Sequence, residues 1–212
     1  MKPGPAIANN LWLAASLPEW MRFRYAANRV EATQRQLLTN YVRENAATAF
    51  GREHKFAKIR SWEEFAEQVP VRPYEDFEPW IGQIAAGTTN VLTAESVNLL
   101  EPSSGSSGAE KWIPYTASLQ AEFRRAVAAW ITDLFFEHPA LKAGRAYWSL
   151  TPPAQRDRSK EVAVPVGFDE DSAYLGGVAR HLVNLALATP QQLRGVKDME
   201  TFWRITLLSL LK

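Results

Sequence analysis

Apolar positions recur at three- and four-residue steps across residues 18–50, with arginines and glutamates between them. This spacing predicts helix over most of that stretch. Gly51 follows it and is predicted to cap the helix at its C-terminal end. Ser61 and Glu64 form the capping-box pattern "SWEE", which predicts a short helix that ends near Gln68.

Prolines and short apolar runs then replace the helical spacing. Residues 69–81 contain three prolines and are predicted to be extended, with one short turn of helix. Residues 87–105 predict a hairpin followed by a strand that leads into a loop rich in serine and glycine. Further extended pieces are predicted at residues 111–116, 145–153 and 162–168.

Three helices are predicted beyond the loop. The first is capped by Thr116 or Ser118, and its apolar stripe consists of Leu119, Phe123, Val127, Trp130, Ile131, Leu134 and Phe135. The second covers about residues 169–189 and follows acidic residues that suit a helix N-terminus. The third covers residues 198–212; it is strongly apolar and shows no recognisable cap. A domain rarely ends on such a helix, so we expect a fragment of a longer protein.

The fold class predicted from this order of elements is α/β. We expect part of a layered domain in which N-terminal helices pack on a mixed sheet. The helical lead-in covers about residues 1–69, and the strands and the loop lie within about residues 70–212.

Composition narrows the classes of function. The net charge of +1 over 212 residues argues against a dedicated nucleic-acid-binding protein, although a local basic patch stays open. No cysteine is present, which excludes disulfides, thiolate metal sites and cysteine nucleophiles. No apolar run approaches the roughly 20 residues of a membrane span. Asn9 and Asn10 interrupt the first apolar run, so we expect a helix start there and a cytoplasmic protein.

The stretch "SSGSSGAEK", residues 103–111, holds four serines, two glycines and a closing lysine. Read alone, it is either a flexible linker or a phosphate site. Glycines at 105 and 108 allow successive amides to point into one concavity, and Lys111 adds a full positive charge. The pattern is not a Walker A loop, because Trp112, Ile113 and Pro114 follow the lysine.

The sequence around this stretch resembles one family. The ordered segments are "NAATAFGREHKF", "VPVRPYEDFEPWI", "GTTNVLTAESV", "SSGSSGAEKWIPYT", "YWSLTPP" and "VPVGFDEDSAYL". Together they resemble the bacterial form of the auxin-responsive-promoter (Gretchen Hagen) family of acyl-acid amido synthetases, a branch of the acyl-adenylate-forming enzymes. The similarity extends over essentially the whole chain.

The resemblance implies an ATP-dependent ligase. Such an enzyme uses Mg-ATP to convert a carboxylic acid into an acyl-adenylate, and an amine, typically that of an amino acid, then forms an amide. The loop is implied to cradle the β- and γ-phosphates, and Lys111 is the implied catalytic residue that offsets their charge. The implied ATP-binding residues are Ser103, Ser104, Gly105, Ser106, Ser107 and Gly108. Position 106 is usually threonine in this signature, and serine keeps the hydroxyl.

Family members are more than twice as long. Their adenine, ribose and magnesium sites and their mobile C-terminal domain come after the part that is similar to this chain, so we expect no metal site here and an incomplete enzyme. Two alternatives stay open. One is an acyl-CoA ligase, which shares the first step; the other is a non-catalytic remnant or binding module. Its partners are expected to be small molecules, with neither nucleic acid nor membrane.

The other clusters of polar residues are expected to have structural roles or to lie on the surface. Asp169, Glu170 and Asp171 are expected to cap a helix, and the basic residues of 156–160 alternate with acids as in a solvated loop. His54, His138 and His181 lack metal-binding spacing and are expected to be surface or packing residues.

Overall fold

The computed structural model describes residues 3–103, 111–147, 162–167, 185–188, 196 and 198–211. These residues form a helix-rich α/β arrangement with a small sheet, which confirms the predicted fold class. The elements are α1 (Pro3–Ala27), α2 (Val30–Glu44), α3 (Ala49–Glu53), α4 (Trp62–Gln68), α5 (Glu78–Ala85), β1 (Leu99–Ser103), β2 (Lys111–Tyr115), α6 (Ala117–Glu137) and α8 (Met199–Leu210), with 3₁₀ turns η1 (Phe56–Lys58), η2 (Tyr74–Phe77) and η3 (Pro139–Ala143).

The chain divides into two compact units. One contains the described residues of Met1–Arg24, Gln120–Ser159 and Phe168–Lys212. The other contains Tyr25–Leu119 and the described residues of Lys160–Gly167, and it includes both strands.

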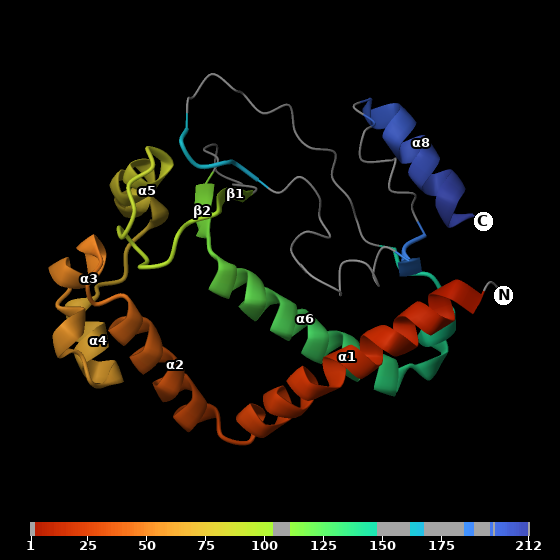
Figure 1. The fold of residues 1–212 in the computed structure, drawn as a ribbon, viewed down its shortest axis with the longest axis horizontal. Coiled ribbons are helices and arrows are strands. Elements are labelled where there is room, and N and C mark those ends of the chain that lie inside the picture. The colour runs from red at the N-terminus through yellow and green to blue at the C-terminus, as the bar shows by residue number, and fades with distance from the viewer. Residues whose placement is uncertain are drawn as a thin grey trace. The chain divides into compact units, whose positions relative to one another are not determined.

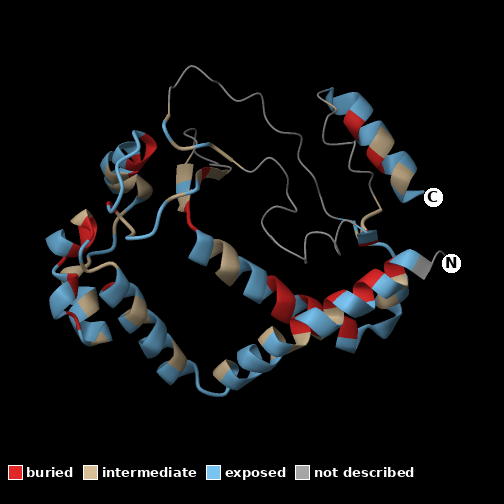
Figure 2. Cartoon of the chain, viewed as in Figure 1, coloured by how far each residue is buried: buried red, intermediate tan, exposed pale blue. Residues whose placement is uncertain are grey.

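The core of the first unit lies between α1 and α6, which run side by side in Figure 1. Trp12 of α1 meets Val127, Ile131 and Phe135 of α6, and the Trp12 and Phe135 rings lie edge to face with centroids 6.2 Å apart. Figure 2 shows buried positions on both helices along this contact. The predicted stripe is therefore confirmed at its centre but wrong at Phe123 and Trp130, which are 37% and 58% exposed.

The helix α8 also belongs to this unit. Phe202 is its buried anchor, packed by Val196 and Ile205. The prediction of an uncapped start is wrong, because the Asp198 carboxylate accepts a hydrogen bond of 2.7 Å from the Thr201 amide.

In the second unit, α2 and α3 pack around Val42 and Phe50. The prediction that Gly51 ends a helix is wrong, because Gly51 lies inside α3 and donates its amide to the N-cap Thr48. A Cβ on Gly51 would lie 2.1 Å from the carbonyl oxygen of Asn45, so this position needs glycine for a close approach rather than for a left-handed turn.

The short helix α4 follows its sequence prediction. It covers Trp62–Gln68, and the Ser61 hydroxyl accepts from the Glu64 amide at 3.2 Å. The Glu64 carboxylate accepts from the amide of Arg60, one residue earlier than the usual capping box.

The sheet is built around β1. β2 pairs with it in antiparallel register, and Val166 makes a parallel bridge to Leu100 on its other side. Two backbone bonds fix that side, from Leu100 N to the Pro165 oxygen at 2.8 Å and from Gly167 N to the Leu100 oxygen at 2.7 Å. Leu100 is fully buried and packs against Ile84 of α5.

Two details around α5 differ from the sequence predictions. The short turn of helix predicted within residues 69–81 is present but longer than expected, because η2 and the start of α5, with Pro79 in its first turn, occupy residues 74–81. Residues 88–98 form bends instead of the predicted hairpin. Their carbonyls at Asn90 and Val91 accept from the amides of Ala49 and Phe50, so this backbone docks on α3.

Two predicted elements fall mostly outside the described residues. Only residues 185–188 of the predicted helix at 169–189 and only the first residues of the predicted strand at 145–153 are described. In that strand Ala146 bridges Leu187. Residues 162–167 were predicted to be extended; they bridge β1 at Val166 but bend at residues 163, 164 and 167, so the prediction is confirmed only at the bridge.

Candidate functional site

The predicted phosphate loop lies between the two strands. Its first residue, Ser103, ends β1, and its closing lysine, Lys111, begins β2; the two are direct partners in the antiparallel register. The predicted residues Ser104, Gly105, Ser106, Ser107 and Gly108 lie outside the described part of the chain. The two ends of the loop are therefore brought together by a strand pair rather than left apart as in an open linker.

The strand pair has two chemically different faces. Residues directly opposite each other share a face, so the pair Ser103–Lys111 lies on the same face as the pairs Glu101–Ile113 and Leu99–Tyr115, and the charged and hydroxyl groups are Glu101, Ser103, Lys111 and Tyr115. The opposite face contains Leu100, which is packed into the core. A polar face that ends in Lys111 is thus held in place by an apolar face underneath.

The phenol of Tyr115 lies on this polar face, and its pKa is shifted by its surroundings. Burial raises the pKa of Tyr115 above its ordinary value, and the carboxylate of Glu101 raises it further. A phenol is protonated at neutral pH already at its ordinary pKa of 10.0, and the upward shift leaves it so, which means that Tyr115 can donate a hydrogen bond on this face. Sequence reasoning did not identify Glu101 and Tyr115; the strand register is what brings them beside Lys111.

Lys111 has two contacts from η2. Its ammonium lies 3.7 Å from Oε1 of Glu75, and their side chains are 32% and 63% exposed. It also lies 5.3 Å from the centre of the Tyr74 ring, within the range of a cation–π contact. An ion pair this exposed is worth less than about 1 kcal/mol, so a ligand of higher negative charge can displace Glu75.

Tyr74 also binds the backbone of β2. Its hydroxyl accepts from Trp112 N at 2.7 Å and donates to Trp112 O at 3.2 Å. Tyr74 and Glu75 were not assigned to the site from the sequence. They lie in the segment "VPVRPYEDFEPWI", and nothing in its local pattern indicates contact with residues more than 35 positions further along.

The other polar candidates have structural roles where they are described. The guanidinium of Arg72 has donors but no acceptor, so Nε2 of His54 accepts the hydrogen bond of 3.2 Å between them. The ring proton therefore lies on Nδ1, which donates to the Phe50 oxygen at 3.0 Å. His54 is buried and stacks on Phe50, which confirms it as a packing residue. His138 is exposed. His181, Asp169, Glu170, Asp171 and residues 156–160 lie outside the described ranges.

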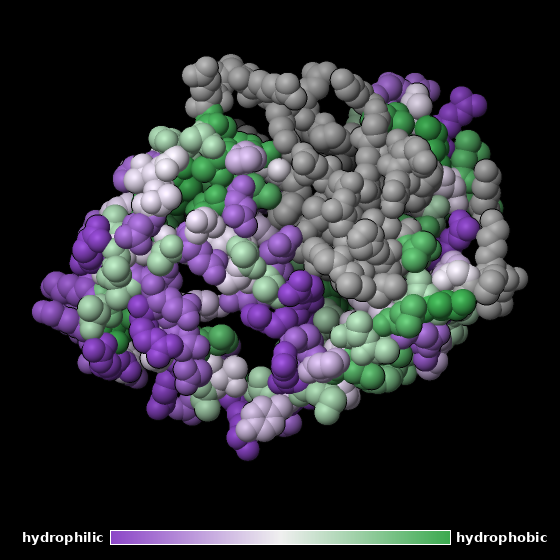
Figure 3. All heavy atoms as spheres, in the orientation of Figure 1, coloured by the Kyte–Doolittle hydropathy of each residue, from purple (hydrophilic) through white to green (hydrophobic). Residues whose placement is uncertain are grey.

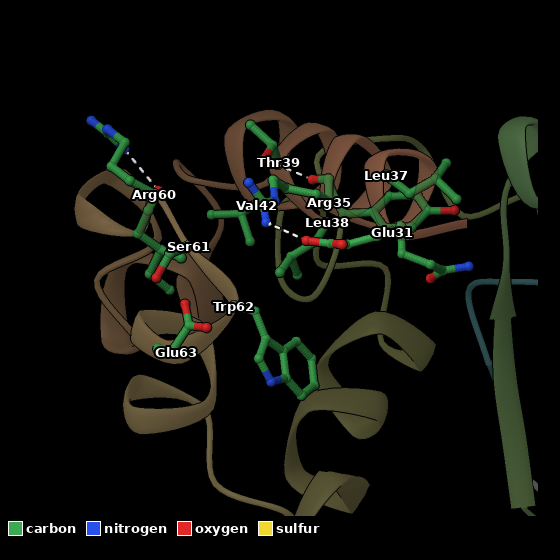
Figure 4. Close-up of a pocket in the computed structure, with 13 residues that line it drawn as sticks. Glu31, Arg35, Leu37, Leu38, Thr39, Val42, Arg60, Ser61, Trp62 and Glu63 are labelled. Carbon is green, nitrogen blue, oxygen red and sulfur yellow. Dashed lines mark hydrogen bonds and ion pairs between the residues drawn. The ribbon is translucent and has the colours of Figure 1, made fainter. Parts of the chain in front are cut away.

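A cavity of about 630 Å³ opens elsewhere in this unit, between α2 and the start of α4 (Figure 4). Leu38, Val42 and Trp62 supply apolar lining. Its charged groups already have partners: Glu31 pairs with Arg35 at 2.8 Å, and hydrogen bonds from its own backbone and then from Ser61 lower the pKa of Glu63. The cavity is distinct from the predicted loop, since neither Ser103 nor Lys111 lines it.

The described residues contain no group of three or more His, Asp or Glu side chains placed to hold a metal ion. The described residues therefore provide no all-protein metal cage, and no chemical step is assigned to a metal here. Within the same residues, no helix combines the length and the apolar character needed to cross a membrane.

Comparison with known proteins agrees with the resemblance inferred from the sequence. Residues 20–201 match the N-terminal domain of the GH3 family. The indole-3-acetic acid-amido synthetase GH3.5 of Arabidopsis thaliana is 28% identical over 122 residues. The alignment covers 57% of this chain and 20% of that protein, so the chain spans only a small part of its relative. Because the match to the family's N-terminal domain covers residues 20–201 of this 212-residue chain, this chain belongs to the GH3 family.

Proposed function

We propose that this chain is the N-terminal part of an ATP-dependent acyl-acid amido synthetase. The domain match supports the family, and the relative's name supports amide formation. The observation that carries the proposal is the pairing of Ser103 with Lys111, which closes the serine- and glycine-rich loop at the end of a strand pair. In this proposal residues 1–69 are a helical lead-in and residues 70–212 hold the strands and the loop.

The proposed first step is adenylation of an acid. A carboxylate oxygen of the acid attacks the α-phosphorus of ATP, the bond to the bridging oxygen breaks, and pyrophosphate leaves. Negative charge builds on the leaving pyrophosphate, and preorganised donors lower the barrier where such charge develops. We assign this stabilisation to Lys111 and to the loop residues Ser103, Ser104, Gly105, Ser106, Ser107 and Gly108.

The proposed second step forms the amide. The amine nitrogen of the second substrate attacks the carbonyl carbon of the acyl-adenylate, AMP leaves, and the nitrogen loses a proton. Magnesium accompanies ATP in adenylating enzymes, and the described residues hold no group of three or more acids or histidines that would bind it without the phosphates. Its ligands, together with the small mobile domain, are assigned to regions of the relatives beyond the part aligned with this chain.

The test is acid-dependent exchange of labelled pyrophosphate into ATP, measured with the protein at its natural length. Lys111→Ala should reduce exchange by two to three powers of ten, equivalent to about 3–4 kcal/mol of transition-state stabilisation. Lys58→Ala is the matched control, because it removes an exposed lysine of the same unit. Thermal unfolding of both variants separates loss of chemistry from loss of fold.

Each outcome selects one interpretation. Unchanged exchange in Lys111→Ala would falsify the role of that lysine. Exchange in the wild type followed by thioester formation, without amide, would favour an acyl-CoA ligase. Absence of exchange with every acid in a panel of aromatic and aliphatic carboxylates would favour a binding module.

A further inference from the structure

The backbone of Trp112, the residue after Lys111, faces away from β1. Lys111 is the first residue of β2, at the end of the ladder. Its neighbour Trp112 lies opposite Pro102, and Pro114 lies opposite Leu100. Both prolines lie in non-hydrogen-bonded pairs, because Leu100 bonds to residues 165 and 167 on the other side of β1 and Trp112 bonds to Tyr74, so their missing amide hydrogens cost the ladder no bond. At Trp112 the backbone faces away from β1, so any support there comes from outside the strand pair.

Tyr74 supplies that support from outside the sheet. The Trp112 amide and carbonyl both bond to its hydroxyl, so both groups point away from β1 and would otherwise form an open strand edge. One hydroxyl thus acts as acceptor and donor to the same residue, which fixes the position of β2 beside Lys111. Tyr74 is itself held in η2, the turn that leads directly into α5.

The same turn also contacts the side chain of Lys111. The Tyr74 ring lies 5.3 Å from the ammonium, and Glu75 lies 3.7 Å from it. Backbone and side chain are therefore restrained by two consecutive residues of one turn. Such restraint matters for catalysis, because displacement of a reacting group by about 1 Å can cost two powers of ten in rate.

We propose that Tyr74 is a positioning residue for Lys111, fixing the strand from which the lysine projects toward the triphosphate. Glu75 keeps the ammonium against the Tyr74 ring until a more highly charged anion replaces it. This inference rests on the proposed function, since it assigns Tyr74 a role in adenylation that acts through Lys111.

The first experiment measures the support itself. Tyr74→Phe keeps the ring and removes the hydroxyl, so hydrogen exchange of the Trp112 amide, followed by NMR in the 212-residue chain, should become at least tenfold faster. Tyr25→Phe is the control, because it removes an exposed tyrosine hydroxyl that accepts a hydrogen bond from Arg29, four residues along the chain. Unchanged protection of Trp112 in Tyr74→Phe would overturn the inference.

The second experiment measures the catalytic consequence by pyrophosphate exchange in the protein at its natural length. Tyr74→Phe should lower kcat by one to two powers of ten and change KM for ATP less than threefold. Tyr74→Leu, which also removes the ring, should lower kcat further. Wild-type kcat in both variants would overturn the inference.

A double variant separates this inference from the proposed function. If Tyr74 acts through Lys111, adding Tyr74→Phe to Lys111→Ala should produce less than a twofold further loss. A further loss equal to that in the wild-type background would show that Tyr74 acts independently and would overturn the inference alone. Wild-type activity of Lys111→Ala would instead overturn the proposed role of the lysine, and the positioning role with it.

Discussion

Gly51 shows how a single hydrogen atom in place of a side chain allows two helices to meet. It lies inside α3, close to Asn45, the residue that caps the end of α2. The Thr48 hydroxyl accepts a hydrogen bond of 2.9 Å from the Gly51 amide and donates one of 2.8 Å to the Asn45 carbonyl. The turn between α2 and α3 is thus closed by hydrogen bonds around a position that has no room for a methyl group.

Gly51→Ala should destabilise the protein by about 1–3 kcal/mol, because the new Cβ would meet backbone atoms that cannot move aside as a flexible side chain can. Gly82→Ala is the matched control, since nothing lies within 4 Å of its Cβ position in α5. There alanine should stabilise by about 0.5–1 kcal/mol. Urea unfolding measures both changes, and equal effects at the two sites would contradict this account of Gly51.

At the scale of elements, the start of α6 is tied to a distant loop. The Thr116 hydroxyl accepts from the Leu119 amide at 3.2 Å, which confirms one of the two predicted caps. Ser118 bonds elsewhere, because its hydroxyl donates to the Glu95 carboxylate at 2.6 Å and its amide adds a longer bond of 3.2 Å. The helix that follows β2 is therefore anchored to the segment that precedes β1.

This anchor predicts a dependence on pH. The Ser118 hydroxyl lowers the pKa of Glu95 below its ordinary value of 4.5, Thr116 and the Ser118 amide lower it further, and burial opposes them. A carboxyl group with a lower pKa in the folded state stabilises the protein fully above its unfolded pKa. That stabilisation is lost as the pH falls through the lowered value.

Glu95→Gln should therefore reduce stability at neutral pH, and its difference from wild type should shrink as the pH falls below 4.5. Urea unfolding across this range measures the trend. Ser118→Ala should raise the pKa of Glu95 toward its ordinary value, observable by carboxyl NMR. An unshifted pKa in Ser118→Ala would mean that the bond contributes nothing to the anchor.

The sequence predicted the elements that local signals specify. The serine cap of α4, the threonine cap of α6 and the two strands around the loop each follow from residues within a few positions of one another. The bends at residues 88–98 were read as a hairpin because their docking partner, α3, is remote in sequence. Asp198 was missed as a cap although aspartate is among the preferred N-cap residues. In the site, Lys111 was predicted from the loop sequence that it closes. Tyr74 was missed because it is remote in sequence and comes close to Lys111 only in the folded chain.

At the scale of the whole molecule, each unit has a core of its own. Trp12 anchors the core of the unit that contains α6, while Phe50 and Leu100 belong to cores of the unit that contains the sheet. The clusters around Phe50 and Leu100 share Trp80 and Leu92 as partly buried neighbours, so they are continuous with each other. The strand pair that ends in Lys111 is therefore supported by the helices of its own unit.

The surface of α8 gives a further prediction. Figure 3 shows hydrophobic atoms along this helix, where Trp203, Leu207 and Leu208 are exposed, and Leu211, which follows it, is 84% exposed. The net charge of the 212-residue chain is only +1, so electrostatic repulsion between copies is weak. Exposed apolar side chains at low net charge favour association. We expect the apparent mass of this chain in sedimentation experiments to rise with concentration.

Leu211→Glu should reduce that rise, because it places a charge within the apolar surface of α8. Val71→Glu is a control with the same change in charge at a fully exposed position of the other unit, and it should leave the association unchanged. Equal effects of the two variants would show that net charge, rather than the α8 surface, governs association. A wild-type chain that stays monomeric at every concentration would show that these side chains do not drive self-association at all.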